Sequence, residues 1–323
     1  MDIDFHFGTV YVLSRWAGFQ AENALAIATA SQFVDDNQPN ILFKHPDVEP
    51  FFQASGHGPV ENVVDILENF SVWVPFHFLP ALAGEKEAER LVCQKGSKLA
   101  EKLRIFAEGL DFGTEATFNQ NIFQLGLMLH VYADTWAHQG FSGIIDALNK
   151  VECPVVLEPE ISHREHEADE QLNAVVPPLG HGKAIHWPDR PYVTWQTKEK
   201  FPEGRSNCKE FLEASQAIYG VLAKVGGSDV LELDEIQLGM LENAFQNTTD
   251  EKEENRCKAW MKLVGQNTFG FADYSEADQD IQYTKEYLLD NETFSRAFYD
   301  GLKVYYAWVR KEIEDAGVKW RED

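Results

Sequence analysis

Apolar side chains recur along this chain with the spacing of one face of a helix. The clearest case is 85–109, where apolar positions repeat every three or four residues and the remaining positions are mostly charged. Glycine and proline interrupt the pattern, for example at Gly18 and in the Asn-Gln-Pro-Asn stretch at 37–40. The pattern predicts helices over the following ranges: 5–17, 20–34, 85–109, 117–149 (one long helix or a helix pair), 206–225, 232–246, 250–265, 276–289 and 291–316.

One long stretch lacks this periodicity. Residues 151–204 combine proline, histidine and tryptophan in a way that is typical of loops, and 151–158 could form one short strand at most. We therefore expect an all-α fold in which a single domain, 1–323, includes this long loop-rich segment. The alternative is a boundary near 204, with 205–323 as a C-terminal helical extension.

Composition narrows the classes of partner. The chain has 323 residues, 44% of them hydrophobic, and a formal net charge of −25, so it can bury a sizeable core but repels polyanions and anionic membrane surfaces. Its start, MDIDFHFG, lacks the features of a signal peptide, and no apolar run reaches membrane-spanning length. We therefore expect a cytoplasmic protein. Its widely spaced cysteines are expected to be free thiols: Cys93, Cys153, Cys208 and Cys257.

The sequence HVYADTWAH at 130–138 places three polar residues in an otherwise apolar stretch. His130, Asp134 and His138 lie four positions apart, so on a helix they drift by only about 40° per step and share one narrow sector. Two imidazoles and a carboxylate suit zinc, and the two oxygens of Asp134 could bridge two ions. The alternative is a hydrogen-bonded His–Asp–His stack in the core, and the triplet alone leaves both open.

Further polar residues are candidate ligands, but each taken singly could also have an ordinary structural role. His77, for example, lies in the apolar stretch VWVPFHFLP, where an imidazole without partners would cost about 1–3 kcal/mol. Each is also typical of a satisfied core residue, a helix cap or a loop. These further candidates are His6, Asp35, Asp36, His77, His181 and Asp189.

The order of these residues resembles the zinc-dependent phospholipase C and single-strand-specific nuclease superfamily. An N-terminal His is followed by Asp after the second helix, His on a third segment, His-x3-Asp on a helix, a further His, and then His with an acidic residue. Several segments also look like an uncharacterised bacterial family related to that superfamily: MDIDFHFG, the AGF of RWAGF, ASQFVDDN, VPFHFLP, LHVYADTWAHQGFSG and GHGKAIHWPDRPY. The resemblance covers residue 1 to about residue 195 and implies an all-α enzyme with a trinuclear zinc site.

Carried over to this chain, the resemblance implies two to three zinc ions. The ligands of the first would be an Asp of the 35–36 pair (Asp36 preferred), His77, His130 and Asp134. Those of the second would be His6, the bridging Asp134 and, in the superfamily, the N-terminal amine. Those of the third would be His138, His181 and Asp189.

Three features depart from the superfamily's pattern. The superfamily usually has a longer gap between the bridging Asp and the next His, whereas only three residues separate Asp134 from His138. The spacing from His181 to Asp189 is longer than the short helical spacing that the superfamily shows. Secreted members also expose their ligand amine by cleaving a leader. For a chain that begins at Met1, we expect Asp2, Asp4 or a water molecule in place of that amine.

The implied activity is hydrolysis of phosphoric diester bonds. Zinc ions about 3.5–4 Å apart share a bridging hydroxide that attacks the phosphorus atom, while the metals neutralise charge on the phosphate oxygens. Asp35 or Asp36, whichever is not a ligand, is the candidate catalytic base or orienter of the water. We expect a small phosphodiester or a phospholipid-like substrate rather than a long nucleic acid. The alternative is a non-catalytic metalloprotein with a structural or degenerate multinuclear site, and other divalent transition metals suit the same ligands.

Overall fold

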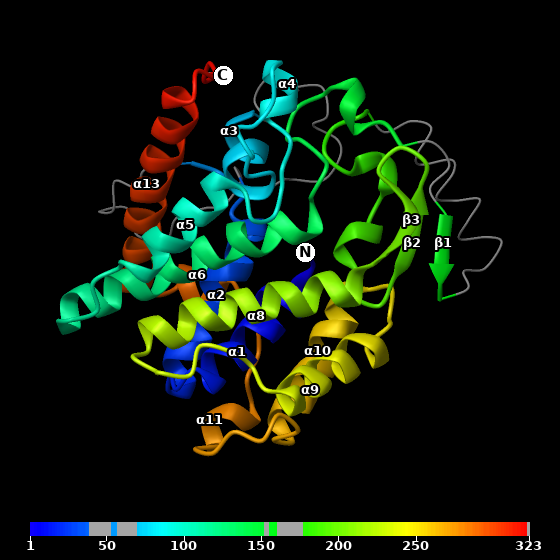
Figure 1. Ribbon diagram of the computed structural model, residues 1–323. Helices are drawn as coiled ribbons and strands as arrows, with labels where there is room; N and C mark the ends of the chain where they lie inside the picture. Colours follow the sequence, from blue (N-terminus) through cyan, green and yellow to red (C-terminus); the bar gives the residue numbers. More distant parts are fainter. Residues whose placement is uncertain (39–52, 57–69, 152–154, 160–176, 322–323) are drawn as a thin grey trace.

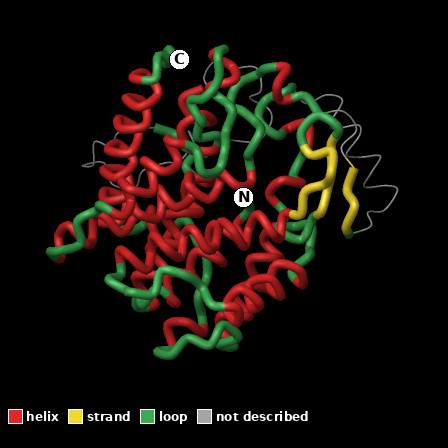
Figure 2. The backbone as a smooth tube through the Cα atoms, in the orientation of Figure 1, coloured by secondary structure: helices red, strands yellow, loops and turns green. Residues whose placement is uncertain are grey.

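Helices make up most of this protein, and a small sheet lies at one edge (Figures 1 and 2). The computed structural model describes residues 1–38, 53–56, 70–151, 155–159 and 177–321. The prediction of a mainly helical fold is confirmed, and the sheet is a correction to the all-α class. The elements that precede the sheet or enter it are η1 (Asp4–Thr9, π-helical), α1 (Val10–Trp16), α2 (Ala21–Asp36), α3 (Phe70–Val72), η3 (Trp73–His77, π-helical), α4 (Glu87–Arg90), α5 (Lys98–Glu108), α6 (Glu115–Ala137), η4 (Ala147–Asn149), β1 (Val155–Glu158), η5 (Gly182–Ala184), η6 (Trp187–Asp189), β2 (Thr194–Thr197) and β3 (Phe201–Ser206).

The helices after the sheet follow the predicted ranges closely. They are α8 (Asn207–Val225), α9 (Glu235–Asn247), α10 (Glu253–Gly265), α11 (Glu276–Gln279), α12 (Glu286–Leu289) and α13 (Glu292–Asp315). The range 276–289 is the exception, because it forms two short helices instead of one.

The central helix of the fold is α6, which packs against α2, α5, α8 and α13. Gly126 allows the close approach to α2, since a Cβ at this position would lie 2.3 Å from the carbonyl oxygen of Ile27. The range 117–149, predicted as one long helix or a helix pair, extends past the helix that forms. α6 ends at Ala137, and Gly140 has a left-handed φ of 84° that a helix does not tolerate. His138 is therefore the C-terminal cap of α6 instead of an interior residue.

The predicted helix 85–109 is also divided. Residues between α4 and α5 form isolated bridges, in which Cys93 pairs with Pro80 and Val92 with Ser142. Gly96 has a φ of 65°, and the side chain of Ser97 then accepts a hydrogen bond from the amide of Ala100 to start α5. The new N-cap at Ser97 separates the two helices. Amphipathic spacing alone did not reveal this break and predicted a single helix.

The sheet is antiparallel, in the order β1–β2–β3. Trp195 of β2 is fully buried, opposite Arg205 of β3. β1 lies within 151–158, where the sequence allowed one short strand. Sequence periodicity missed β2 and β3 because they are four and six residues long and β3 contains a proline and a glycine.

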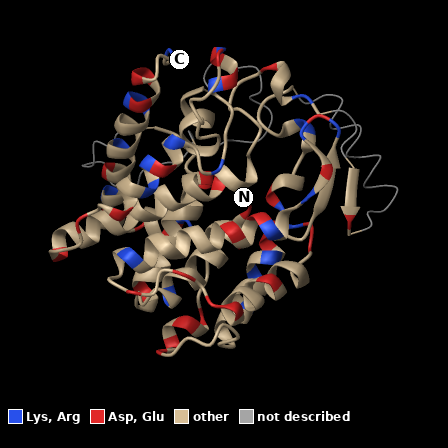
Figure 3. Cartoon of the chain, viewed as in Figure 1, with Lys and Arg blue, Asp and Glu red and all other residues tan. Residues whose placement is uncertain are grey.

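Several sequence-based expectations concern the surface and the thiols. Acidic residues (red) and basic residues (blue) both occur along many of the helices in Figure 3. Among the described residues, each helix is too short or too polar to span a lipid bilayer. Cys93, Cys208 and Cys257 are buried free thiols, as predicted, whereas Cys153 lies outside the described residues.

Candidate metal centre

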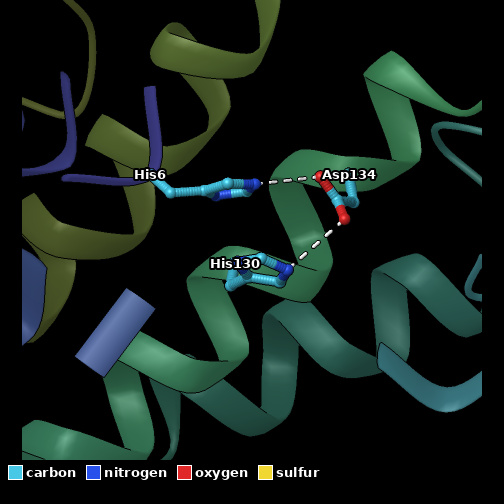
Figure 4. A group of neighbouring side chains, drawn as sticks. All are labelled: His6, His130 and Asp134. Carbon is cyan, nitrogen blue, oxygen red and sulfur yellow. Dashed lines mark hydrogen bonds and ion pairs between the residues drawn. The ribbon is translucent and has the colours of Figure 1, made fainter. Parts of the chain in front are cut away.

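The predicted polar residues converge at the C-terminal end of α6, around the carboxylate of Asp134. Its Oδ1 lies 3.1 Å from Nε2 of His6, and its Oδ2 lies 3.4 Å from Nε2 of His130 (Figure 4). The same Oδ2 is 3.3 Å from Nδ1 of His77 and 3.5 Å from Nδ1 of His138. Asp134 is 1% exposed, so four imidazoles surround one buried carboxylate.

Three groups of these side chains have the geometry to hold a metal ion. Within each group, ligand atoms lie within 4.8 Å of one another. The groups are His6, His130 and Asp134; Asp35, His77 and His130; and His138, His181 and Asp189. His130 belongs to the first two groups, and the third has the composition that the resemblance implies.

Two of the ligand histidines sit in π-helical segments. His6 is in η1 and His77 is in η3. A π-helical turn contains an extra residue and redirects the side chains that follow, and such turns are frequent at functional sites. η1 and η3 thus bring two imidazoles to the carboxylate of Asp134 from two different segments of the chain.

The structure distinguishes the two candidates of the Asp35–Asp36 pair. Oδ1 of Asp35 lies 3.7 Å from both Nδ1 of His77 and Nε2 of His130. Asp36, which the sequence preferred as the ligand, instead accepts a hydrogen bond from the hydroxyl of Tyr283. Consecutive helical residues point about 100° apart, so only one of the two reaches the histidines.

The long gap between His181 and Asp189 is closed by two 3-10 turns, η5 and η6. Ile185 between them has a left-handed φ of 56°, which reverses the chain. As a result, Nε2 of His181 lies 3.2 Å from Oδ2 of Asp189, and Nε2 of His138 lies 3.0 Å from Oδ1 of the same carboxylate.

The N-terminus differs from the expectation that Asp2, Asp4 or a water replaces the amine. The buried amine of Met1 lies 2.6 Å from Oδ1 of Asp134 and 3.3 Å from Oδ1 of Asp189. Asp2 and Asp4 instead form ion pairs with Arg256. The amine therefore sits between the two carboxylates that anchor the first and third groups.

Backbone carbonyls fix the orientation of three imidazoles. Nε2 of His77 donates to the carbonyl of Ser55 at 2.7 Å, Nδ1 of His138 to that of His77 at 2.6 Å, and Nδ1 of His181 to that of Ile185 at 2.8 Å. A carbonyl only accepts, so each of these nitrogens carries the proton, and in the neutral ring the other nitrogen presents a lone pair to the carboxylates. Lone pairs facing carboxylate oxygens repel unless a cation lies between them. Metal-binding histidines are oriented in the same way, so this donor set fits a metal.

Electrostatics favours the protonation states that metal ligands need. Burial lowers the pKa of His130 and of His181 to about 4, so both rings are neutral near pH 7. For Asp134, burial opposes ionisation, but His138, the Met1 amine and His130 outweigh it and hold the pKa well below its usual value. Neutral imidazoles beside an ionised carboxylate are the forms that bind metals.

Most of the candidate ligands line a pocket of about 590 Å³, whereas His6 and His130 are fully buried outside its lining. Trp73 lines one part of it, and residues 251–254, at the start of α10, line another. Asp35 and Asp36 both face this pocket. The site thus combines closely spaced ligands with room for a small organic molecule, a volume within the ordinary range of ligand pockets.

A family model matches residues 1–313 of this chain. The chain belongs to DUF6765, a family of unknown function. No curated protein and no solved structure matches it significantly. Because the DUF6765 match continues through α8, α9 and α10 and into α13, the C-terminal helices are part of the unit that defines the family.

Arg256, which the sequence did not indicate as a site residue, connects these C-terminal helices to the site. Arg256 of α10 is fully buried, and its Nε donates to Asp4 at 3.2 Å while another guanidinium nitrogen pairs with Asp2. It also donates to the carbonyl oxygens of residues 250 and 251 at 2.8 and 3.1 Å. Arg256 thereby fastens the turn that carries the Met1 amine and His6. An isolated arginine in an amphipathic helix gives no sequence signal for such a role.

A second missed residue of this DUF6765 chain supports the end of α6. The guanidinium of Arg205 on β3 donates to the carbonyl oxygens of Trp136 and Ala137, each at 2.8 Å. A cation at a helix C-terminus satisfies its last carbonyls and complements the helix dipole. The sheet that the sequence did not predict therefore fixes the position of Asp134 and His138.

Proposed function

We propose that this protein is a metal-dependent hydrolase of phosphoric diester bonds, with zinc as the favoured metal. The single observation that carries the proposal is the carboxylate of Asp134, shared by surrounding imidazoles at the base of an open pocket. A structural metal site is closed, whereas a catalytic one keeps an open position. The resemblance to the phospholipase C and nuclease superfamily supports the same reaction.

The residues divide into three ligand sets, which follow the groups described above. Bound divalent ions would supply positive charge for the phosphate oxygens and acidify water. Asp36 is left outside the ligand sets, and its carboxylate is held at the pocket wall by Tyr283. Asp36 is therefore the candidate to orient the attacking water, whereas Asp35 is the candidate ligand.

The pocket favours a small substrate. A volume of about 590 Å³ accommodates a phosphodiester headgroup. Acidic side chains at 251, 253 and 254 contribute to its lining, and the chain carries a formal net charge of −25. A long polyanion would meet repulsion outside the pocket even when metals neutralise its base.

A non-catalytic metalloprotein is the second candidate, and one observation favours it. The Met1 amine lies 2.6 Å from Asp134, and the carboxylates of Asp134, Asp189 and Asp35 outweigh burial and raise its pKa to about 11. An ammonium group at this position already neutralises part of the charge that a catalytic metal would neutralise.

Metal content and turnover separate these functions. The protein is purified without a metal-binding tag or chelator, and metal per chain is measured by elemental mass spectrometry. Hydrolysis of bis(4-nitrophenyl) phosphate and a panel of phosphodiesters is then followed before and after chelation. We expect two to three metal equivalents and turnover that chelation removes and zinc restores. Full metal content without turnover on any diester would favour the non-catalytic function, and less than half an equivalent after incubation with zinc would refute both.

A further inference from the structure

Arg190, the residue after Asp189, lines the same pocket. Among the described residues, its guanidinium makes no ion pair or hydrogen bond, and its Nε is buried without a partner. Each of the other described arginines binds a carboxylate or a backbone carbonyl. In so acidic a chain, a guanidinium that faces a pocket without a carboxylate partner requires an explanation.

The backbone of Arg190 is firmly held although its side chain has no partner. Its carbonyl oxygen accepts a hydrogen bond from Nδ2 of Asn207 at 2.8 Å. Asn207 is fully buried, and its Oδ1 accepts a bond of 3.0 Å from the indole of Trp195. The base of the side chain is therefore fixed to the sheet and α8, which lowers the entropy lost when the guanidinium binds a ligand.

The partner that suits this guanidinium is an oxyanion. Arginine presents a planar fork of N–H donors that matches two oxygens of a phosphate, and such charge-assisted bonds are among the strongest in proteins. A buried donor without an acceptor costs about 1–3 kcal/mol, and a ligand oxygen would remove that cost. We propose that Arg190 binds a phosphoryl oxygen of the ligand and selects phosphate esters over uncharged esters. This inference rests on the proposed function, because the phosphate is taken to be the group that reacts.

The charges that line the pocket also determine whether such an anion can bind. Its lining holds the carboxyl groups of Asp2, Asp35, Asp36, Asp134, Asp189, Glu251, Glu253 and Glu254. Among the described residues that line the pocket, the cationic groups opposing them are Arg190, Lys252 and the Met1 amine. Carboxylates in this excess repel a phosphate until bound cations offset them. Arg190 therefore binds phosphate in the metal-loaded protein and not in the metal-free protein.

Isothermal titration calorimetry with inorganic phosphate and with dimethyl phosphate tests this assignment. Both probes are titrated into zinc-loaded and metal-free protein, for the wild type and for Arg190→Met, Arg190→Lys and Lys252→Met. We expect Arg190→Met to weaken phosphate binding roughly 10- to 100-fold, with Arg190→Lys in between and zinc content unchanged. Lys252→Met removes the same charge from the same pocket without the fork, so its effect stays below about threefold. Comparison of the two probes shows whether a monoester-like dianion or a diester monoanion is preferred.

Several outcomes would overturn the assignment. These are phosphate affinity within twofold of wild type in Arg190→Met, equal losses in Arg190→Met and Lys252→Met, loss of zinc from Arg190→Met, and no phosphate binding by the zinc-loaded wild type. Arg190-dependent phosphate binding without any diester hydrolysis would sink the proposed function and leave this inference standing. Diester hydrolysis whose kcat and KM are unaffected by Arg190→Met would refute this inference alone.

Discussion

Replacement of Arg256 by methionine tests whether α10 positions the N-terminal ligands. The substitution leaves the carboxylate of Asp4, which is fully buried, without its cation. Removal of one partner from a buried ion pair costs about 3–5 kcal/mol. With an unfolding entropy of about 2.1 cal/mol/K per residue over 323 residues, this loss corresponds to a fall in Tm of about 4–7 °C.

The metal measurement gives the decisive result, since a fall in Tm alone would follow from any broken core contact. The turn that Arg256 fastens carries the Met1 amine and His6. Loss of a group that orients a ligand typically weakens metal binding about 10- to 100-fold. We therefore expect Arg256→Met to lose affinity for one zinc ion, measured by competition with a chromogenic chelator, while the remaining sites keep theirs.

Arg15→Met is the matched control. Arg15 is also buried, and it forms a comparable ion pair with Asp278 at 2.8 Å. Neither residue belongs to the three groups of candidate ligands. We expect it to lower Tm by a similar amount and to leave zinc binding unchanged. Equal zinc affinity in Arg256→Met and Arg15→Met, at equal loss of Tm, would refute the positioning role of Arg256.

Three further predictions concern the ligands themselves. Asp134→Asn should reduce bound metal by more than one equivalent in elemental mass spectrometry, because Asp134 faces several imidazoles; unchanged metal content would contradict its bridging role. Asp35→Asn should lose about one equivalent and Asp36→Asn none, since only Asp35 approaches His77 and His130; the reverse pattern would restore the assignment of Asp36 as the ligand. In metal-free protein, burial holds the pKa of His130 at about 4, below its ordinary 6.5, so the unfolded chain takes up this proton first. The contribution of His130 to the free energy of unfolding is therefore complete above pH 6.5 and falls by roughly 3 kcal/mol as the pH drops to about 4. A Tm independent of pH across that window would show that His130 is not buried in its neutral form.

The helices and most of the ligand positions could be predicted from the sequence because their signals are local. Amphipathic spacing gave α2, α8, α9, α10 and α13 to within about three residues at each end. The four-residue spacing of His130, Asp134 and His138 predicted that they share one side of α6, because four residues are about one helical turn. His138 nevertheless lies at the cap, since the end of the helix depends on Gly140 and on Arg205 from the sheet.

The remaining features depend on contacts between distant parts of the chain. Asp35 and Asp36 are chemically identical neighbours. They are distinguished by contacts with residues distant in sequence, namely His77 and His130 for Asp35 and Tyr283 for Asp36. The ion pair of Arg256 with Asp4 spans 252 positions. No local pattern encodes such a pair, so the contact between α10 and the candidate site could not be predicted from the sequence.

The ion pair between Asp4 and Arg256 also determines when the first ligand group can form during synthesis of the chain. During translation, the turn that carries His6 leaves the ribosome long before Arg256, which follows Asp4 by 252 positions. Domains generally complete their long-range contacts only after the segments involved have been synthesised. The first ligand group therefore acquires its final geometry only after α10 has emerged. Metal acquisition is expected to be a late step in maturation, and a nascent chain stalled before α10 should hold the metal of the first group weakly.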